Sequence, residues 1–241
     1  MIKEDQSWAT VTDLACERAI VEMLAAATPD FGFYTEEEVV TPRERRAYTW
    51  LIDPIDGTHN FHYGLPCFAV QVALEHQGCV IAGAIALPAE GITVRAALGA
   101  GCWANGDRVR VSSRPSEAGL LLLENAWTDI GLRVAHACRS RFNDLRVIGS
   151  SCASLAYVAI GRADAVIAPG IKPWDVAAGS LMVQEAGGRV TNLRGGTLDL
   201  YAPDCMASNA IAHAPMLAAL VCLEPPMRNE ASAEMKAGVG L

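Results

Sequence analysis

The sequence predicts a chain of the mixed α+β and α/β classes, built from two halves that differ in strand pattern. Segments in which apolar and polar residues alternate follow one another between residues 67 and 111, and Gly-containing turns at Gln77-Gly78 and Asn105-Gly106 separate them, as in an antiparallel meander. Beyond residue 117, predicted strands alternate with predicted helices, which favours mixed or parallel pairing. The chain has 241 residues, and 51% are hydrophobic, which is enough to bury a large core.

These observations predict three segments. Residues 1–116 form an N-terminal α+β half with an antiparallel sheet, and residues 117–223 form a C-terminal α/β half. Residues 224–241 contain Pro, Glu, Ser and Gly with few large apolar groups, so we expect a disordered tail.

Composition excludes several classes of function. The 27 acidic and 19 basic residues give a net charge of −8, which disfavours direct binding to nucleic acid. The first residues lack the apolar core of a signal peptide, and no apolar run is long enough to cross a bilayer. None of the eight cysteines forms a C-x-x-C pair, which indicates reduced thiols. We therefore expect a cytoplasmic protein without membrane contact.

The N-terminal elements begin with a helix over residues 13–27, for which Asp13 is a candidate N-cap. Pro29-Asp30-Phe31-Gly32 ends this helix, and a short strand at Phe33-Tyr34 leads into the acidic run Glu36-Glu37-Glu38. Such a run is usually a solvated surface, but a glutamate directly after a strand can also face a metal ion. Residues 40–47 have the composition of an exposed, mobile loop.

The stretch from Trp50 to Phe61 carries the strongest chemical signal. Three apolar residues deliver Asp53 at the end of a buried strand, and Pro54 is expected to stop further strand pairing. Asp56 follows, and Thr58 is expected to cap a new helix whose first N–H groups are free. The carboxylates suit Mg²⁺ and the N–H groups suit a phosphate, although Asp-Pro and Asp-Gly pairs also occur in ordinary turns.

The remaining elements follow the two patterns described above. We expect strands over residues 67–75, 80–87 and 93–97, then a hairpin around Asn105-Gly106, and a change of character near Arg114-Pro115-Ser116. The second half is expected to contain strands over 120–125, 144–148 and 163–168, a strand starting at 189–191, and helices over 129–141, 151–160, 176–186 and 215–221.

Five acidic residues lie at predicted strand ends or helix starts, where α/β proteins tend to place their chemistry. These candidates are Asp13, Glu36, Asp53, Asp56 and Asp175. Each also has an ordinary structural explanation as a cap, a turn or a surface group. The five histidines share no ligand spacing and are interpreted as structural.

Four separated segments together resemble the inositol monophosphatase family, in the order that the family has them. They are Thr10-Val11-Thr12-Asp13 followed by Glu17, Thr35-Glu36-Glu37, the stretch from Trp50 to Phe61, and Trp174-Asp175-Val176-Ala177-Ala178-Gly179 followed by Glu185-Ala186-Gly187-Gly188. The resemblance covers roughly residues 3–221 and implies a layered α-β-α-β-α sandwich. Family members usually carry a further N-terminal helix before the position of Lys3, and we expect its absence here to affect stability or dimer packing.

The resemblance implies Mg²⁺-dependent hydrolysis of a phosphate monoester by a metal-activated water, with inhibition by lithium and a homodimeric assembly. Glu36 and Asp53, with the backbone carbonyl of Ile55, would hold one Mg²⁺, and Asp53, Asp56 and Asp175 a second. A third, looser ion would lie near Glu36, and Mn²⁺ is expected to substitute. The implied catalytic residues are Asp13, Thr58 and Glu36. Thr58, hydrogen-bonded to Asp13, would orient the attacking water.

The resemblance also implies where a small phosphorylated alcohol or sugar would bind. The N–H groups of Gly57 and Thr58 would hold the phosphate, while Asp56, Asp175 and the segment Gly149-Ser150-Ser151 would contact the rest. The alternative for that segment is that it only caps the following helix.

One departure bears on the substrate. Ala168 stands where inositol-specific members often carry a glutamate, which weakens inositol 1-phosphate as the sole substrate. Histidinol phosphate, fructose bisphosphate and a nucleotide 3′-phosphate remain alternatives. A different class of function, an inactive or regulatory binding protein, is also kept open.

Overall fold

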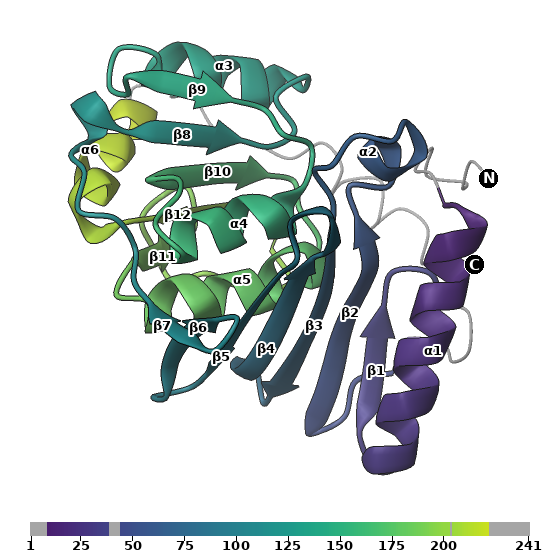
Figure 1. The fold of residues 1–241 in the computed structure, drawn as a ribbon. Helices are drawn as coiled ribbons and strands as arrows, with labels where there is room; N and C mark the ends of the chain where they lie inside the picture. The colour runs from purple at the N-terminus through teal and green to yellow at the C-terminus, as the bar shows by residue number, and fades with distance from the viewer. Residues whose placement is uncertain (1–8, 39–43, 203, 222–241) are drawn as a thin grey trace, which may run out of the picture.

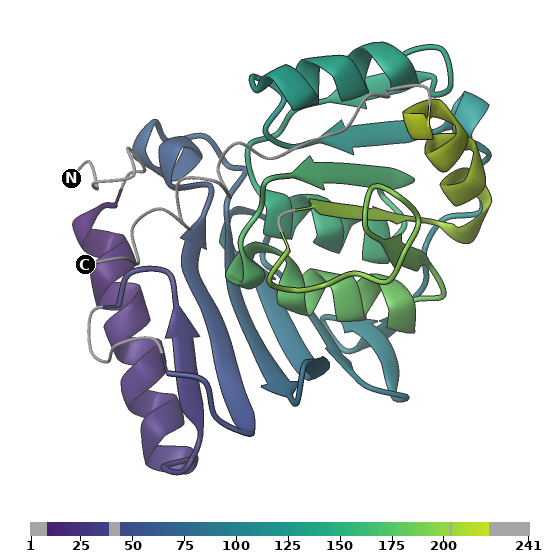
Figure 2. The same ribbon diagram turned by 180° about the vertical axis from the view of Figure 1, so that it is seen from behind.

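The computed structural model describes residues 9–38, 44–202 and 204–221, and arranges them in five layers (Figure 1). Helix α1 (Val11–Ala27) covers one face of a seven-stranded sheet, and helices α4 (Ser151–Ala159) and α5 (Pro173–Glu185) lie between that sheet and a five-stranded one. Helices α3 (Asp129–Cys138) and α6 (Ala210–Val221) cover the outer side of the second sheet, as Figure 2 shows from behind. The expected α-β-α-β-α sandwich is confirmed.

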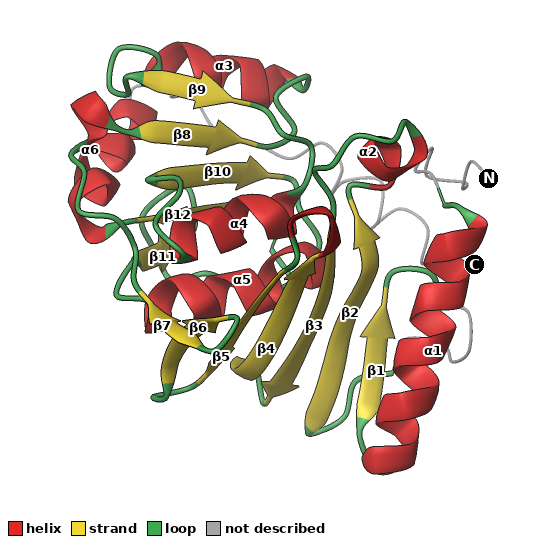
Figure 3. Cartoon of the chain, in the orientation of Figure 1, coloured by secondary structure: helices red, strands yellow, loops and turns green. Residues whose placement is uncertain are grey.

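The first sheet has its strands in chain order, from β1 to β7. Its members are β1 (Gly32–Thr35), β2 (Tyr48–Asp56), β3 (Ala69–His76), β4 (Cys79–Leu87), β5 (Ile92–Ala97), β6 (Gly101–Ala104) and β7 (Asp107–Val109). Pairing from β2 onward is antiparallel, as the alternating pattern predicts. Strand β1, however, pairs with β2 in parallel, with Gly32 opposite Thr49 and Thr35 opposite Ile52 (Figure 3).

The second sheet has the order β11-β12-β10-β8-β9. Its members are β8 (Leu120–Leu123), β9 (Asp144–Arg146), β10 (Ala165–Pro169), β11 (Arg189–Thr191) and β12 (Asp204–Ser208). Strands β8, β9 and β10 are parallel, while β12 runs antiparallel to both of its neighbours, so the expected mixed pairing is present. Helix α2 (Thr58–His62) and two 3-10 turns, Pro88–Glu90 and Ser116–Ala118, complete the fold.

Two residues begin their helices differently from the prediction. Asp13 does not cap α1: the N-cap is Thr10, and the Asp13 carboxylate at the third helical position accepts a hydrogen bond from the Thr10 N–H at 2.8 Å. Thr58 does not cap α2 either, since the N-cap is Gly57 with φ +91°. In both cases the predicted cap lies inside the first turn, and its side chain points to the site described below.

Strand β2 does not end at Asp53 as predicted. Asp53 pairs with Gln71 and Asp56 pairs with Ala69, so three steps along β2 correspond to two along β3. This is a β-bulge with one extra residue, and it contains Pro54, whose missing N–H is tolerated where the ladder is interrupted. The strand therefore continues past the proline and delivers a second carboxylate.

The two halves share one core. Buried residues of the first sheet, such as Leu51 and Ile85, belong to the same apolar cluster as Leu155 of α4 and Met182 of α5. Close approach requires small residues: a Cβ built on Gly179 of α5 would lie 2.4 Å from the Cβ of Leu155. The predicted boundary after residue 116 falls between the strands of the first sheet and those of the second, and the division into two domains stays a prediction.

The remaining sequence predictions concern the C-terminal tail, the loop over 40–47, membrane-spanning segments and the cysteines. The tail over 224–241 and residues 40–43 of the loop predicted over 40–47 lie outside the described residues. Within the described part, no helix combines the length and the apolar character needed to cross a membrane. The cysteines described there are free thiols, and Cys102, Cys138, Cys152 and Cys205 are buried.

Candidate active site

Four carboxylates from three segments of the chain meet at one end of the first sheet. Strands β1 and β2 run in parallel, so their carboxyl ends coincide, and the N–H of Glu36 donates to the carbonyl of Ile52 at 3.2 Å, next to Asp53. The negative charges of Glu36, Asp56 and Asp175 each raise the pKa of Asp53, after the larger effect of burial. The four acidic side chains therefore face one another closely enough to interact electrostatically, and ligand oxygens of Asp53 and Asp56 lie within 4.8 Å of each other.

Asp53 is the most enclosed member of this group, with 2% of its surface exposed. Its Oδ1 atom is buried without any hydrogen-bond partner among the described residues. A buried carboxylate oxygen without a donor is costly, and a nearby cation removes that cost. The other donors of the group are also carboxylates, and hard oxygen ligands are those that Mg²⁺ prefers. The residues present thus fit a divalent cation.

Asp56 is held by helix α4. Its Oδ2 accepts the N–H of Cys152 at 2.6 Å and the hydroxyl of Ser150. Burial raises the pKa of Asp56, and the hydrogen bonds from Ser150 and Cys152 oppose that rise.

Asp175 is held at the start of helix α5. Its Oδ2 accepts the N–H of Lys172 at 2.8 Å, as a carboxylate in the first helical turn commonly does. Burial, followed by the charge of Asp56, raises the pKa of Asp175 well above its ordinary value. Its orientation is therefore set by the helix start, and the charge it carries faces other carboxylates.

Thr58 and Asp13 form the hydrogen bond predicted from the sequence. The Thr58 hydroxyl lies 3.2 Å from Oδ1 of Asp13 and 3.0 Å from the carbonyl oxygen of Ile55. Both side chains are buried, and Asp13 also accepts from the Thr10 N–H. The hydroxyl has one proton and two acceptors, so its lone pairs remain free to accept a bond from a third group.

The turn between β2 and α2 depends on Gly57. Its φ of +91° disfavours any side chain, and an added Cβ would lie 3.0 Å from the carbonyl oxygen of Cys67 and 3.1 Å from that of Gly149. Asn60 fixes the same contact, since its Nδ2 donates to the carbonyls of Cys67 at 2.6 Å and Ile148 at 2.7 Å. Sequence reasoning assigned no role to Asn60, although it stands inside the central stretch.

The loop that carries Glu36 is supported by Glu17 of α1. Glu17 is fully buried, and its Oε2 accepts the N–H of Glu37 at 2.7 Å. The helix thereby contributes Asp13 and Glu17, one helical turn apart on one face, to the carboxyl end of the sheet.

The segment Gly149-Ser150-Ser151 begins helix α4. Ser150 is the N-cap, and its hydroxyl oxygen accepts the N–H of Ala153 at 3.2 Å while the hydroxyl donates to Asp56. The capping interpretation is therefore confirmed for Ser150, and contact of this segment with a substrate stays a prediction.

A further buried acid, Glu124, was missed by the sequence analysis. It follows strand β8, its N–H donates to the carbonyl of Ile167 at 2.9 Å, and its Oε1 accepts the hydroxyl of Ser154. Burial raises the pKa of Glu124 to about 7, although hydrogen bonds from Ser154 and from the N–H groups of Gly149 and Ser150 lower it. Only its position after an apolar run, Leu120-Leu121-Leu122-Leu123, could have signalled a buried carboxyl.

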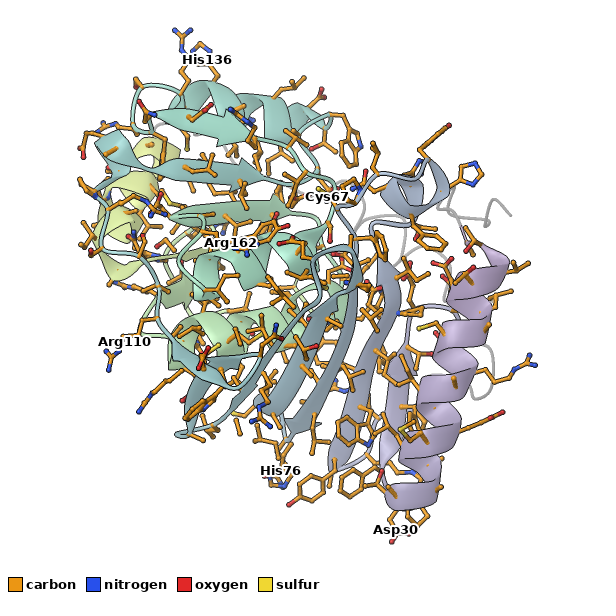
Figure 4. All side chains as sticks on the ribbon, viewed as in Figure 1. Asp30, Cys67, His76, Arg110, His136 and Arg162 are labelled. Carbon is orange, nitrogen blue, oxygen red and sulfur yellow. The ribbon has the colours of Figure 1, made fainter. Side chains whose placement is uncertain are left out.

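Three of the five histidines that were predicted to be structural, His76, His136 and His213, lie away from these acids. His76 and His136 project from opposite ends of the molecule (Figure 4), and His76 stacks on Tyr48 with ring centroids 4.2 Å apart. His213 is buried between the hydroxyls of Thr191 and Ser208. None of these three belongs to the acidic group.

Comparisons with known proteins show similarity in sequence and in fold over most of the chain. The profile described as "Inositol monophosphatase family" matches residues 2–224. The chain is 34% identical to "Fructose-1,6-bisphosphatase/inositol-1-monophosphatase" of Thermotoga maritima, covering 85% of this chain and 78% of that protein. It is 37% identical to "Nus factor SuhB" of Xylella fastidiosa, covering 80% and 72%. The crystal structure of extragenic suppressor protein suhB from Bartonella henselae superposes with a TM-score of 0.86 at 33% identity, covering 91% of this chain and 87% of that one.

Proposed function

Because the chain belongs to the inositol monophosphatase family and is a phosphoric monoester hydrolase, we propose that it hydrolyses a small phosphorylated alcohol or sugar with Mg²⁺ bound by Glu36, Asp53, Asp56 and Asp175. The observation that carries this proposal is the buried Oδ1 of Asp53, which lacks a hydrogen-bond partner among the described residues while neighbouring carboxylates repel it. A pair of divalent cations beside these oxygens removes both penalties. Mn²⁺ has the same preference for oxygen ligands and is expected to substitute.

When bound, Mg²⁺ offsets the charge of the carboxylates and of the phosphoryl oxygens and makes a coordinated water more acidic. The protein's own residues then have distinct tasks. The Thr58 hydroxyl, which donates to Asp13 and to the carbonyl of Ile55, accepts a hydrogen bond from a water molecule. This hydrogen bond would orient the water toward the phosphorus. Glu17 holds the loop that carries Glu36 through the N–H of Glu37, and the Glu36 carboxylate would bind the ion from that loop.

The phosphate is expected to bind against the turn between β2 and α2. The N–H groups of Gly57 and Thr58 would donate to phosphoryl oxygens, and the absence of a side chain on Gly57 lets the phosphate approach the backbone. Asp56, held by Ser150 and the N–H of Cys152, would hold the water that protonates the leaving alcohol. Asp175 and the start of α4 would form the wall around the alcohol.

Substrate preference is the least constrained part of the proposal. Ala168 is buried at the end of β10, so this position offers no polar group to a ring hydroxyl. A relative whose name joins fructose-1,6-bisphosphatase and inositol-1-monophosphatase supports an enzyme that accepts more than one ester. Phosphate release from inositol 1-phosphate, fructose 1,6-bisphosphate, histidinol phosphate and a nucleoside 3′-phosphate, at equal Mg²⁺, would rank them.

A regulatory binding role is a second candidate, since relatives named "Nus factor SuhB" are 37% and 34% identical to this chain over the aligned residues. The two candidates differ in their need for the carboxylates. Hydrolysis requires the acidic group, whereas a binding role through another surface does not. Lithium inhibition and dimerisation belong to the family expectation and are measured by activity with added LiCl and by light scattering.

The test of the hydrolase proposal is Asp53→Asn, compared with Asp107→Asn in the exposed edge strand β7. We expect Asp53→Asn to lose at least about 100-fold in Mg²⁺-dependent phosphate release, because a ligand of the ion is gone. Mg²⁺ should also raise the melting temperature of the wild type and of Asp107→Asn but not of Asp53→Asn. Unchanged turnover in Asp53→Asn would overturn the assignment of the site.

A further inference from the structure

A thiol faces the proposed metal site. Among the residues that the structure describes, one group of three side chains places potential metal-ligand atoms within 4.8 Å of one another: a carboxylate oxygen of Asp53, a carboxylate oxygen of Asp56 and Sγ of Cys152. The sulfur belongs to the first turn of α4, and its residue is fully buried. The expected ligand set contained no sulfur, so this neighbour changes the chemistry that the site offers.

Packing between α4 and α5 fixes the direction of the thiol. Its Sγ lies 3.3 Å from the carbonyl oxygen of Asp175 and 3.9 Å from that of Trp174, while the N–H of the same residue donates to Asp56. The sulfur is therefore held against the same first turn of α5 that supplies the Asp175 carboxylate. It cannot turn away to solvent without disrupting this helix contact.

A second, independent observation points to a cation at this place. Oδ1 of Asp53 is buried, and no described residue donates a hydrogen bond to it. Protein–zinc bonds are about 2.3 Å to sulfur and about 2.1 Å to a carboxylate oxygen, so tetrahedral ligation places these atoms about 3.6 Å apart. Starting from separations of at most 4.8 Å, the ligand atoms need to approach one another by at most about 1.2 Å, which is within reach of small changes in side-chain torsion angles.

The two kinds of donor discriminate between cations. Mg²⁺ takes hard oxygen ligands and gains little from sulfur, whereas a thiolate strongly favours Zn²⁺, Cd²⁺ and Co²⁺. We propose that Cys152 gives the site a high-affinity mode for a thiophilic divalent cation, represented by Zn²⁺, which Asp53, Asp56 and Cys152 bind together and which displaces Mg²⁺ and stops hydrolysis. The inhibitory part of this inference rests on the proposed function of the same carboxylates.

The binding step balances simply. The Sγ–H bond breaks, its proton passes to bulk water, and a bond from Sγ to the cation forms, with no change of oxidation state. The weak hydrogen bond from the thiol to the Asp175 carbonyl is lost. Binding of Zn²⁺ therefore releases the Cys152 thiol proton, which binding of Mg²⁺ at the same carboxylates does not.

The experiment uses Co²⁺ as a probe, because a Co²⁺–thiolate bond gives a near-ultraviolet charge-transfer absorption that carboxylate ligands do not. Wild type, Cys152→Ala, Cys152→Ser and the matched control Cys102→Ala are titrated with CoCl₂ after removal of divalent cations. Cys102 is also fully buried but lies in strand β6, so both alanine variants lose the same atom from the core. We expect the absorption in wild type and Cys102→Ala and not in the two Cys152 variants.

The affinity of each variant for Zn²⁺ supplies a second readout. The dissociation constant for Zn²⁺, measured by isothermal titration, should rise at least about 10-fold in Cys152→Ala relative to Cys102→Ala. A charge-transfer band that persists in Cys152→Ser, or Co²⁺ binding to wild type without such a band, would overturn the proposal. Should Cys152→Ala not fold, Cys152→Ser, which keeps a similar volume, decides the question alone.

This outcome is separable from that of the hydrolase proposal. Loss of Mg²⁺-dependent turnover on every ester tested, with a thiolate band present, contradicts the proposed reaction and leaves the thiol ligand in place. Turnover that responds to Mg²⁺, with no band in wild type, contradicts the thiol ligand alone. Inhibition of wild-type hydrolysis by Zn²⁺ that Cys152→Ser does not weaken contradicts the competitive role.

Discussion

Replacing Glu124 by Gln should stabilise the protein at alkaline pH and change its pH dependence in a defined direction. Glu124 is 3% exposed, and burial raises the pKa of its carboxyl from 4.5 to about 7. The folded state therefore binds more protons than the unfolded chain between these two values, so its stability falls as the pH rises through that window. The penalty is complete above pH 7, and Gln, which cannot ionise, avoids it.

The magnitude follows from the two pKa values of Glu124. One pKa unit corresponds to about 1.4 kcal/mol, so the full penalty reaches about 3 kcal/mol, of which about 2 to 3 kcal/mol develops between pH 5 and pH 8. A pH-independent cost of the amide group, for example against the N–H groups of Gly149 and Ser150, does not affect this difference. The quantity to compare is thus the change in unfolding free energy between pH 5 and pH 8.

Urea unfolding at pH 5 and pH 8, without divalent cations, measures it for the wild type, Glu124→Gln and the exposed control Glu117→Gln. From pH 5 to pH 8 the wild type and the control should each lose about 2 to 3 kcal/mol of unfolding free energy relative to Glu124→Gln. Parallel curves for the wild type and Glu124→Gln would refute the reasoning, because they would mean that the carboxyl titrates alike in both states.

Two further predictions concern the turn after β2 and the second sheet. Gly57→Ala should lower the unfolding free energy by about 2 kcal/mol or more and reduce phosphate release, since a positive φ and contacts of 3.0 Å and 3.1 Å oppose the new methyl group. Gly78→Ala, at φ +87° with open space around it, should cost about 1 kcal/mol and leave turnover intact, and equal losses in thermal unfolding for both variants would contradict the steric argument. Burial lowers the pKa of His213 from 6.5 to about 4, so the folded state binds fewer protons in that window and stability falls as the pH drops through it. Between pH 7 and pH 4.5 the wild type should lose about 2 kcal/mol relative to His213→Gln in urea unfolding, and equal slopes for the two proteins would count against it.

The sequence located most strands and helices and all four carboxylates of the candidate metal site. Alternation of apolar residues predicted strand β3, which buries one face and half-buries the other, and the turn residues on either side bounded β4 and β5. The acids could be found because the central stretch and the Trp174-Asp175 segment each place a carboxylate beside an apolar element. The prediction that these acids converge rested on the resemblance to the family, because no local pattern predicts which strand ends meet.

What the sequence did not predict depends on contacts between distant residues. Pro54 was expected to end β2, but a proline is compatible with a bulge, and pairing with β3 resumes at Asp56. Asp13 and Thr58 were assigned to helix caps from local chemistry, whereas Thr10 and Gly57 occupy those positions and release both side chains for the site. Glu124 was overlooked because its burial follows from Ser154 of a helix thirty residues later in the chain.

The bulge in β2 also explains why the spacing of its two acids matters as much as their identity. In a regular strand, side chains three positions apart emerge on opposite faces. The additional residue between Asp53 and Asp56 cancels that parity, so both stand above the same row as Gln71 and Ala69, facing helix α5. Deleting Pro54 or Ile55 would leave every charge in the chain yet turn one of the two acids to the other face of the sheet, so we expect such a deletion to impair the site as severely as the loss of either carboxylate.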